Sequence, residues 1–168
     1  MKKADLLIAH NKGAYTIIVE GRANFDYGLP LRNFAKNLDN SFTQIAIDLR
    51  ACLGMDSTFM GIMAMIGLKA KKKNVQVEIL NAGESNRYLL EGLGLDKLFK
   101  FVDKDTCNIC DEKIEPDADS CSILDQAETV VDAHRTLTRI DKKNIPKFEK
   151  VIEFAQEDVD KLKKKDKK

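Results

Sequence analysis

The 168-residue chain has no tryptophan and only two histidines, and these shortages limit what it can be. His10 and His134 lie far apart in the sequence, which argues against a histidine-based catalytic site. Each is interpreted as a lone residue without a ligand role, His134 on a helix face and His10 in a loop. Neither G-x-x-x-x-G-K-[ST] nor G-x-G-x-x-G occurs, so no phosphate cradle for nucleotide hydrolysis is visible. The sequence does not favour an enzyme, and we predict no cofactor.

The chain also lacks a charge bias and a long apolar run. Its 28 basic and 27 acidic residues give a formal net charge of +1, which favours neither nucleic acid nor acidic partners. A lysine cluster at 69–73 is interpreted as the solvated end of a helix, because no aromatic residues interleave it. No apolar run approaches the length needed to span a bilayer, and no signal peptide precedes the first predicted strand. We expect a soluble, cytoplasmic protein without membrane insertion.

The four cysteines do not form a recognisable metal site. Cys107 and Cys110 make a C-x-x-C with Cys121 nearby, but a closed zinc site would still lack its fourth ligand. A thioredoxin-like redox pair would open a helix after a strand, whereas this pair lies in a polar stretch. No base is predictable beside Cys52, so it is not assigned as a nucleophile. We predict reduced thiols that bind no metal.

The first hundred residues alternate between strand and helix signals. Short β-rich runs at 5–9 and 15–20 flank the turn signal Asn11-Lys12-Gly13 and predict a hairpin. The remaining predicted elements are a helix at 30–38 with Pro30 in its first turn, a central strand at 44–49, a helix at 57–72, a strand at 75–80, a helix at 84–91 closed by Gly92 or Gly94, and a strand at 98–102. This order predicts an α/β fold with a mixed β-sheet and helices packed on one side.

Small residues recur every third position in the predicted helix at 57–72. Gly61, Ala64 and Gly67 would let the backbone of this helix lie close to another element. Glycine lowers helix stability, so close approach is the reason we infer for its presence, and we expect the sheet to be the neighbour.

Composition changes after Val102. Residues 104–122 are rich in Asp, Glu, Pro, Ser and Cys and lack apolar periodicity, which predicts a linker. Residues 123–168 carry two apolar stripes interrupted at 141–145, because Ile145 precedes Pro146 and is disfavoured from helical angles. We therefore predict a domain at 1–103, a linker at 104–122 and a C-terminal helical extension at 123–168. The extension must bury its stripes on the same chain, in a homodimer or on a partner, and packing on the same chain is favoured.

One stretch in the middle of the chain organises the functional interpretation. Residues 45–50 predict a buried strand, and a short loop leads to Asp56, Ser57 and Thr58 at the start of a helix. Asp56 or Ser57 can cap that helix by accepting a bond from a backbone N–H. The two hydroxyls then lie at the positive end of the helix dipole, where an added phosphate is tolerated better than at most positions.

This stretch resembles the STAS domain family, which covers anti-sigma-factor antagonists and the cytoplasmic domains of sulphate transporters. The resemblance is carried by Asp48-Leu49, by Asp56-Ser57-Thr58 opening a helix, and by the later run 93–99, Leu-Gly-Leu-Asp-Lys-Leu-Phe. It extends from about residue 4 to about residue 103. Phe59 stands where the family often has Gly, and Asn24 where an early loop often has a carboxylate.

The resemblance implies a regulatory protein-binding module like a bacterial anti-sigma-factor antagonist, acting in signal transduction and regulation of transcription. Ser57 maps to the phosphorylated hydroxyl. A serine kinase of the anti-sigma type would bind the unphosphorylated form, and a PP2C-type phosphatase would reset it. The partner surface would comprise Asp56, Thr58, Phe59, Met60 and Asn24. We expect phosphate at Ser57 to weaken partner binding while leaving the fold stable.

Two other hypotheses belong to different classes. The chain would be a constitutive STAS adaptor subunit of a lipid-transport complex if Ser57 is never phosphorylated. It would be a redox enzyme if Cys107 and Cys110 react as a fast thiol pair. Without the resemblance, plain helix capping explains Ser57 and Thr58.

Overall fold

The structure is a computed structural model that describes residues 5–104, 112–114 and 122–167. Strands β1 (Asp5–Asn11) and β2 (Ala14–Ala23) form the predicted hairpin, and Lys12 and Gly13 in its turn have φ of 45° and 86°. Three further strands follow in parallel: β3 (Gln44–Asp48) pairs with β2, β5 (Val77–Leu80) pairs with β3, and β6 (Phe99–Val102) pairs with β5. The result is a mixed sheet in the order β6-β5-β3-β2-β1-β7, where β7 is the short strand Glu112–Ile114.

Two short strands were missed by the sequence analysis. Strand β4 (Cys52–Met55) lies in the predicted loop before the second helix and pairs with the end of β2. Strand β7 (Glu112–Ile114) lies inside the predicted linker and pairs with β1. Neither run has the length or the alternation that marks a strand, so pairing with an existing sheet edge decides its conformation. The three linker cysteines lie outside the described residues.

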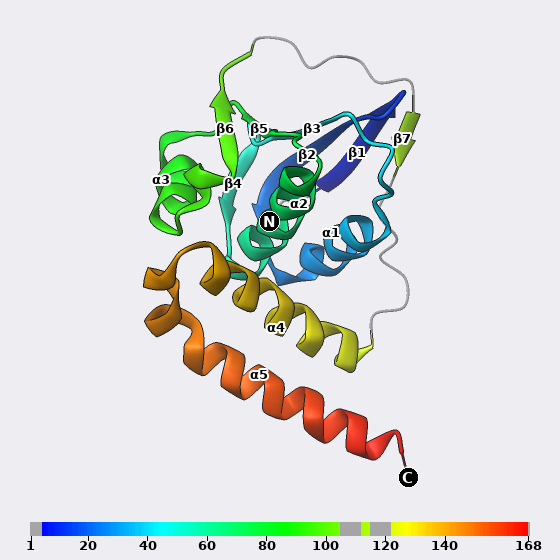
Figure 1. Ribbon diagram of the computed structural model, residues 1–168, viewed down its shortest axis with the longest axis vertical. Helices are drawn as coiled ribbons and strands as arrows, with labels where there is room; N and C mark the ends of the chain where they lie inside the picture. The colour runs from blue at the N-terminus through cyan, green and yellow to red at the C-terminus, as the bar shows by residue number, and fades with distance from the viewer. Residues whose placement is uncertain (1–4, 105–111, 115–121, 168) are drawn as a thin grey trace.

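Helices α1 (Phe25–Asn37) and α2 (Ser57–Lys72) cover one face of the sheet, as the sequence predicted (Figure 1). Their apolar sides close the core with the inward side chains of the strands, including Ile17, Ile45, Ile47, Leu31, Phe59, Ile62, Met63 and Ile66. Helix α3 (Glu84–Gly92) and the 3₁₀ turn η1 (Leu95–Lys97) complete the domain. Gly94, with φ of 76°, follows α3 in the left-handed conformation that favours glycine.

Helix α1 begins five residues earlier than predicted. Asn24 caps it by accepting a hydrogen bond from the Asp26 backbone N–H at 3.1 Å, so Pro30 lies inside the helix and not in its first turn. Proline lacks an N–H, which leaves the carbonyl of Asp26 without its helical donor. Asp26 is exposed, so water can bond that carbonyl. Buried Leu31 and Ala35 hold the helix against the core.

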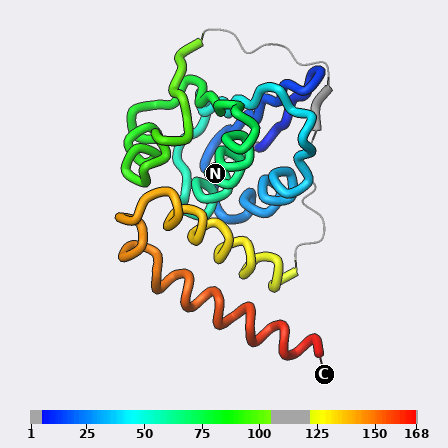
Figure 2. The backbone as a smooth tube through the Cα atoms, viewed as in Figure 1, coloured from blue at the N-terminus to red at the C-terminus, as the bar shows by residue number. Residues whose placement is uncertain are grey.

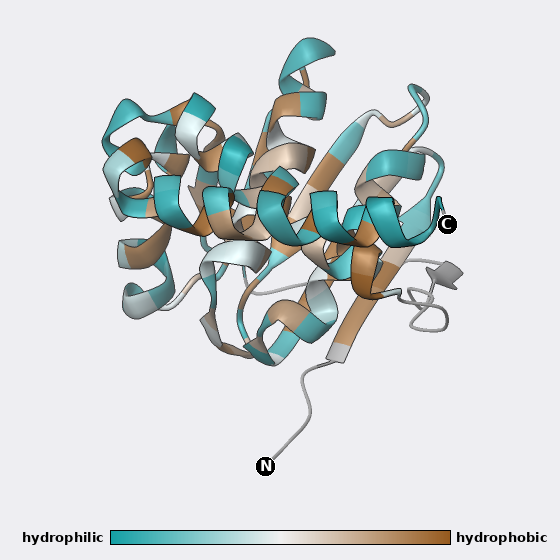
Figure 3. Ribbon diagram, turned by 90° about the horizontal axis from the view of Figure 1, so that it is seen from below, coloured by the Kyte–Doolittle hydropathy of each residue, from teal (hydrophilic) through white to brown (hydrophobic). Residues whose placement is uncertain are grey.

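The C-terminal region forms two antiparallel helices, as predicted. Helix α4 (Ile123–Ile140) lies across the N-terminal end of α2, and after the turn η2 (Lys142–Asn144) helix α5 (Ile145–Lys165) packs outside α4 (Figures 1 and 2). Seen from below, the outer side of α5 is largely hydrophilic (Figure 3). Because α4 lies between α2 and α5, its apolar stripe is buried within the same chain. This is the arrangement that the sequence favoured. The predicted α/β fold class, a mixed sheet with helices on one side and a helical extension, is confirmed.

Candidate functional site

The start of α2 is built by the strand that precedes it. Pairing of β4 with β2 brings the Asp56 backbone N–H to the carbonyl of Ala23 at 3.1 Å, which places Asp56 beside the loop that holds Asn24. The Asp56 carboxylate caps α2 by accepting a hydrogen bond from the Phe59 N–H at 2.8 Å. Of the two caps considered from the sequence, Asp56 is the one used, and Ser57 is the first residue of the helix.

Ser57 has a partner that the sequence gave no reason to expect. Its Oγ lies 2.9 Å from His134 Nε2 on α4, and His134 Nδ1 lies 2.7 Å from the Val130 carbonyl. A carbonyl only accepts, so Nδ1 carries the proton; in a neutral ring Nε2 is then the acceptor and the Ser57 hydroxyl donates to it. Burial lowers the pKa of His134 from its ordinary value of 6.5, against the opposing effects of the Val130 bond and the Asp56 charge. His134 is thus neutral at pH 7. It lies on a helix face as predicted, and its bond to Ser57 is the feature that the sequence did not indicate.

Helix α4 approaches α2 closely because Gly61 has no side chain. A Cβ placed at Gly61 would lie 2.5 Å from the carbonyl oxygen and 2.8 Å from the Cβ of Ala133. Gly61 therefore makes room for α4, and not for the sheet as its spacing suggested. A Cβ at Gly67 would meet Phe99 of β6 and Leu98, the residue before that strand. Gly67 therefore lies against the sheet, as the spacing predicted. Contact between helix backbones at such short range requires the smallest residues.

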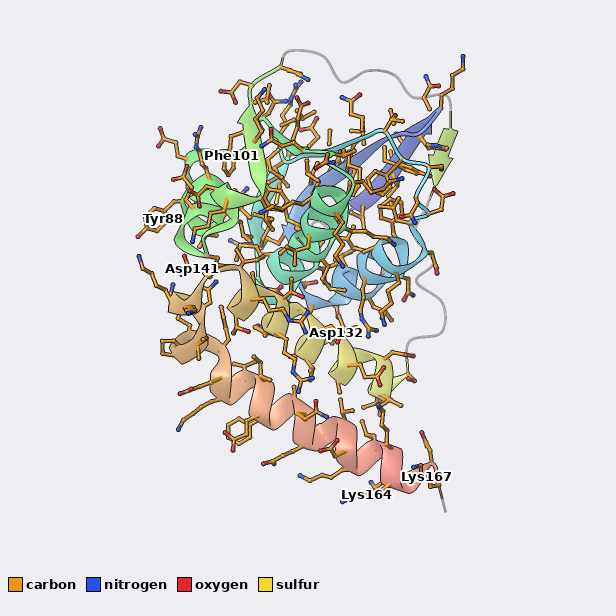
Figure 4. The ribbon with its side chains drawn as sticks, viewed as in Figure 1. Tyr88, Phe101, Asp132, Asp141, Lys164 and Lys167 are labelled. Carbon is orange, nitrogen blue, oxygen red and sulfur yellow. The ribbon has the colours of Figure 1, made fainter. Side chains whose placement is uncertain are left out.

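A buried ion pair joins α4 to α1. The Arg32 guanidinium, on a residue only 3% exposed, donates to Asp132 Oδ2 from Nε at 3.1 Å and from Nη2 at 2.6 Å. Figure 4 shows Asp132 on the side of α4 that faces the sheet domain. Glu128 lies 3.9 Å from the same guanidinium. In the sequence, Arg32 and Asp132 look like ordinary surface charges. They are 100 positions apart, so no local pattern could have paired them.

The residues assigned to the partner surface divide into two groups. Asn24 is exposed and Asp56 is half-buried, and both lie at the same corner of the molecule. Thr58, Phe59 and Met60 are 7%, 0% and 5% exposed, and Phe59 and Met60 are part of the main core cluster. These three side chains therefore offer no contact surface to a partner in this conformation.

The remaining candidates for chemistry lie apart from Ser57. Cys52 is buried, and burial raises the pKa of its thiol, which leaves it a poor nucleophile at neutral pH. His10 belongs to β1, not a loop, and stacks on Tyr15. Within residues 5–104, 112–114 and 122–167, no group of three His, Cys, Asp or Glu side chains could hold a metal ion. In the same described part of the chain, no helix is long and apolar enough to cross a membrane.

Ser57 and His134 have the spacing of a nucleophile and a base, but His134 does not bond to the carboxylate that orients the base in a catalytic triad. His134 Nδ1 bonds to a backbone carbonyl and the nearby Asp56 carboxylate is occupied by the helix cap. An apolar cavity of about 650 Å³ lies between α4 and α5 near Phe25, and neither Ser57 nor His134 lines it.

Comparison with known proteins gives one solved structure to report. No family model matches the chain, and no curated protein matches it. The chain is similar to the solved structure described as "Structure of the Anti-Sigma Factor Antagonist SpoIIAA in its Unphosphorylated Form". The sequences are 12% identical, the match covers 62% of this chain and 90% of that one, and the TM-score is 0.45. Function is therefore inferred from the residues of this chain.

Proposed function

We propose that the chain is a regulatory protein-binding module, of the anti-sigma-factor-antagonist kind, that is switched by phosphorylation of Ser57. The observation that supports this most is the position of the Ser57 hydroxyl. It lies at the positive end of α2 and donates across the α2–α4 contact to a neutral imidazole. A change of charge at this one atom therefore acts on how two parts of the chain fit together.

Phosphate at Ser57 removes a hydrogen-bond donor from this contact. The esterified oxygen can no longer donate to His134 Nε2, and about −1.5 to −2 charges enter a half-buried position beside the Asp56 carboxylate. The N–H groups at the start of α2 offset part of that repulsion. A neutral His134 offers the phosphate no donor at Nε2 unless it gains a proton. The start of α2 therefore tolerates the phosphate, whereas the packing of α4 against α2 does not. We expect the phosphate to weaken the packing of α4 more than the fold of the sheet domain.

The proposed partners follow from the resemblance to the STAS family. A serine kinase of the anti-sigma type would bind the unmodified protein and phosphorylate Ser57, and a PP2C-type phosphatase would restore it. Asn24 and Asp56 are accessible members of the proposed contact surface. We place this activity in the bacterial cytoplasm, in the control of transcription, with residues 1–103 as the binding domain, 104–122 as the linker and 123–168 as the extension that covers Ser57.

Phosphopeptide mass spectrometry tests the proposal directly. The purified chain is incubated with ATP and an extract of its native cells, in parallel with Ser57→Ala, Thr58→Val and Ser41→Ala variants. Thr58→Val keeps the shape of a buried side chain without its hydroxyl. Ser41→Ala removes an exposed hydroxyl near the C-terminal end of α2, away from Ser57. We expect one phosphate per chain on the peptide containing Ser57, lost only in Ser57→Ala.

A binding assay separates the switch from the alternative function. Ser57→Ala is expected to retain the partner that the unmodified protein captures, and Ser57→Asp to lose most of it. If no phosphate is found on Ser57 and Ser57→Asp binds the same partner as strongly as the unaltered protein, the phosphoswitch is wrong. The constitutive adaptor of a lipid-transport complex then becomes the better hypothesis.

A further inference from the structure

The contact between α4 and the sheet domain contains few large apolar side chains. Among the buried residues of α4, only Ala133 and Leu137 belong to the main core cluster, and Val131 packs toward α5. The opposite side of α2 carries large buried side chains into the domain core, namely Ile62, Met63 and Ile66. Separating α4 from α2 therefore exposes much less apolar surface than unfolding the domain does.

The polar groups at this contact keep partners when α4 leaves. The hydroxyls of Thr129 and Thr136 donate to carbonyls four residues earlier in α4 itself, at 2.6 and 2.7 Å. Arg32 and Ser57 bond to α4 when it is docked, and water can replace those bonds once it separates. None of these four groups is left buried and unpaired by the separation, and buried unpaired polar groups are the usual obstacle to opening a packed interface.

Helices α4 and α5 are joined to each other, and the turn between them is tied to the domain by contacts that do not involve Ser57, Arg32 or Gly61. Val131, Ala155 and Val159 form a second small core between them. At the turn that joins them, Asn144 Nδ2 donates to the carbonyl of Leu93 at 2.9 Å, and Lys97 pairs with Asp141 at 2.8 Å. Asp141 lies at this anchored end in Figure 4. The pair can thus swing as one body about its anchored end.

We propose that α4 and α5 form an autoinhibitory cover over the Ser57 end of α2. The proposal rests on the proposed function in taking Ser57 as the modified residue. In the closed state α4 hides the hydroxyl in its bond to His134, and a kinase reaches Ser57 only after α4 swings away. The open state presents Arg32, Ser57 and the bare backbone at Gly61, a surface that fits a partner helix carrying a carboxylate beside a small residue. Asp132 and Ala133 of α4 supply that pattern in the closed state.

Gly61→Ala is the variant that opens the cover with the least disturbance elsewhere. The added methyl would lie 2.5 Å from a backbone oxygen of α4, which cannot move without moving the helix. Alanine favours the helical conformation more than glycine does, so α2 itself is not weakened. Gly92→Ala is the matched control, because a Cβ there meets nothing within 4 Å. Ala133→Leu applies the same wedge from α4 and leaves every residue of the sheet domain unchanged.

The two histidines provide a readout that does not depend on phosphorylation. Proton NMR of the full chain follows both imidazoles against pH, with His134→Gln assigning the signal and His10 in β1 as reference. Burial lowers the pKa of His134 in the closed state. We expect its pKa to rise toward 6.5 in Gly61→Ala and Ala133→Leu and to stay lowered in Gly92→Ala, with circular dichroism showing an intact fold in each.

The rate of Ser57 phosphorylation then tests the consequence of opening. A minor open state populated at about 0.1–10% predicts that holding the cover open speeds modification roughly 10- to 1,000-fold. A pKa of His134 that remains lowered in both wedge variants overturns the cover. So does a freed His134 with phosphorylation no faster than in the unaltered protein. A freed His134 with no phosphate on Ser57 in any variant supports the cover and refutes the proposed modification.

Discussion

Asp132→Ala tests whether α4 is held by a buried charge. Arg32 is 3% exposed, while the side chain of Asp132 is 38% exposed, so the two ends of this ion pair are unequal. Removing one partner of a fully buried pair costs about 3–5 kcal/mol. Asp132 is partly solvated and Glu128 stays 3.9 Å from the guanidinium, which reduces the loss to about 1.5–3 kcal/mol, the range for a hydrogen bond to a charged group.

Substitution of the other partner of the ion pair should cost less stability. Arg32→Met fills most of the same volume with an apolar chain, and Asp132 then returns its exposed carboxylate to water. We expect a loss of about 1 kcal/mol or less. The loss from Asp132→Ala also has an upper limit, the free energy that docks α4, because undocking lets water reach Arg32. The test is therefore whether Asp132→Ala loses more stability than Arg32→Met does.

Urea unfolding followed by circular dichroism measures both losses. With a slope of about 2 kcal/mol per molar urea, Asp132→Ala should lower the midpoint by roughly 1 M. The double variant closes a thermodynamic cycle that isolates the coupling. Asp158→Ala, which removes an exposed carboxylate from α5, is the control. Equal losses below about 0.5 kcal/mol for Asp132→Ala and Arg32→Met would show that Arg32 is not buried against α4.

Four further expectations can be checked separately. The pKa of His134 is lowered in the folded state, so its contribution to stability is complete above pH 6.5 and falls as the pH drops toward the lowered pKa. The urea midpoint should therefore be higher at pH 7.5 than at pH 5.5. His134→Gln should make this difference smaller. Leu137→Ala should destabilise the chain by about 2–5 kcal/mol, because a fully buried side chain of the main cluster is lost, and thermal unfolding measures it. Elemental analysis of protein purified under mild reduction should find no stoichiometric zinc; one zinc per chain, lost in Cys107→Ser, contradicts this. A homodimer through the C-terminal helices would bury Phe154, now 64% exposed, so Phe154→Asp should make any dimer monomeric by light scattering.

The sequence by itself determined the elements whose signals are local. The helix at 57–72 was predicted with the bounds that α2 has, because its apolar spacing, the Asp56 cap and the lysines of its last turn all act within a few residues. The break between α4 and α5 lies where the sequence predicted it, but the predicted reason was wrong. Ile145, before Pro146, is helical with φ of −56° and ψ of −57°, and the extended Asp141 ends α4. The mixed sheet followed from the order of strands and helices along the chain. Ser57 was singled out because its position at the start of a helix is visible in the sequence.

Only the tertiary structure decided what covers Ser57. The stripe on α4 predicted burial, but it carried no information about which surface would bury it. From the sequence, Gly61 indicated close approach to a sheet and His134 was interpreted as a lone imidazole, while Arg32 gave no signal of its own. Each has its partner on an element 70 or more positions away, and whether two such groups meet depends on the shape of the whole fold. Strands β4 and β7 were hidden for the same reason, because a short strand is stabilised by the edge that it joins and not by its own residues.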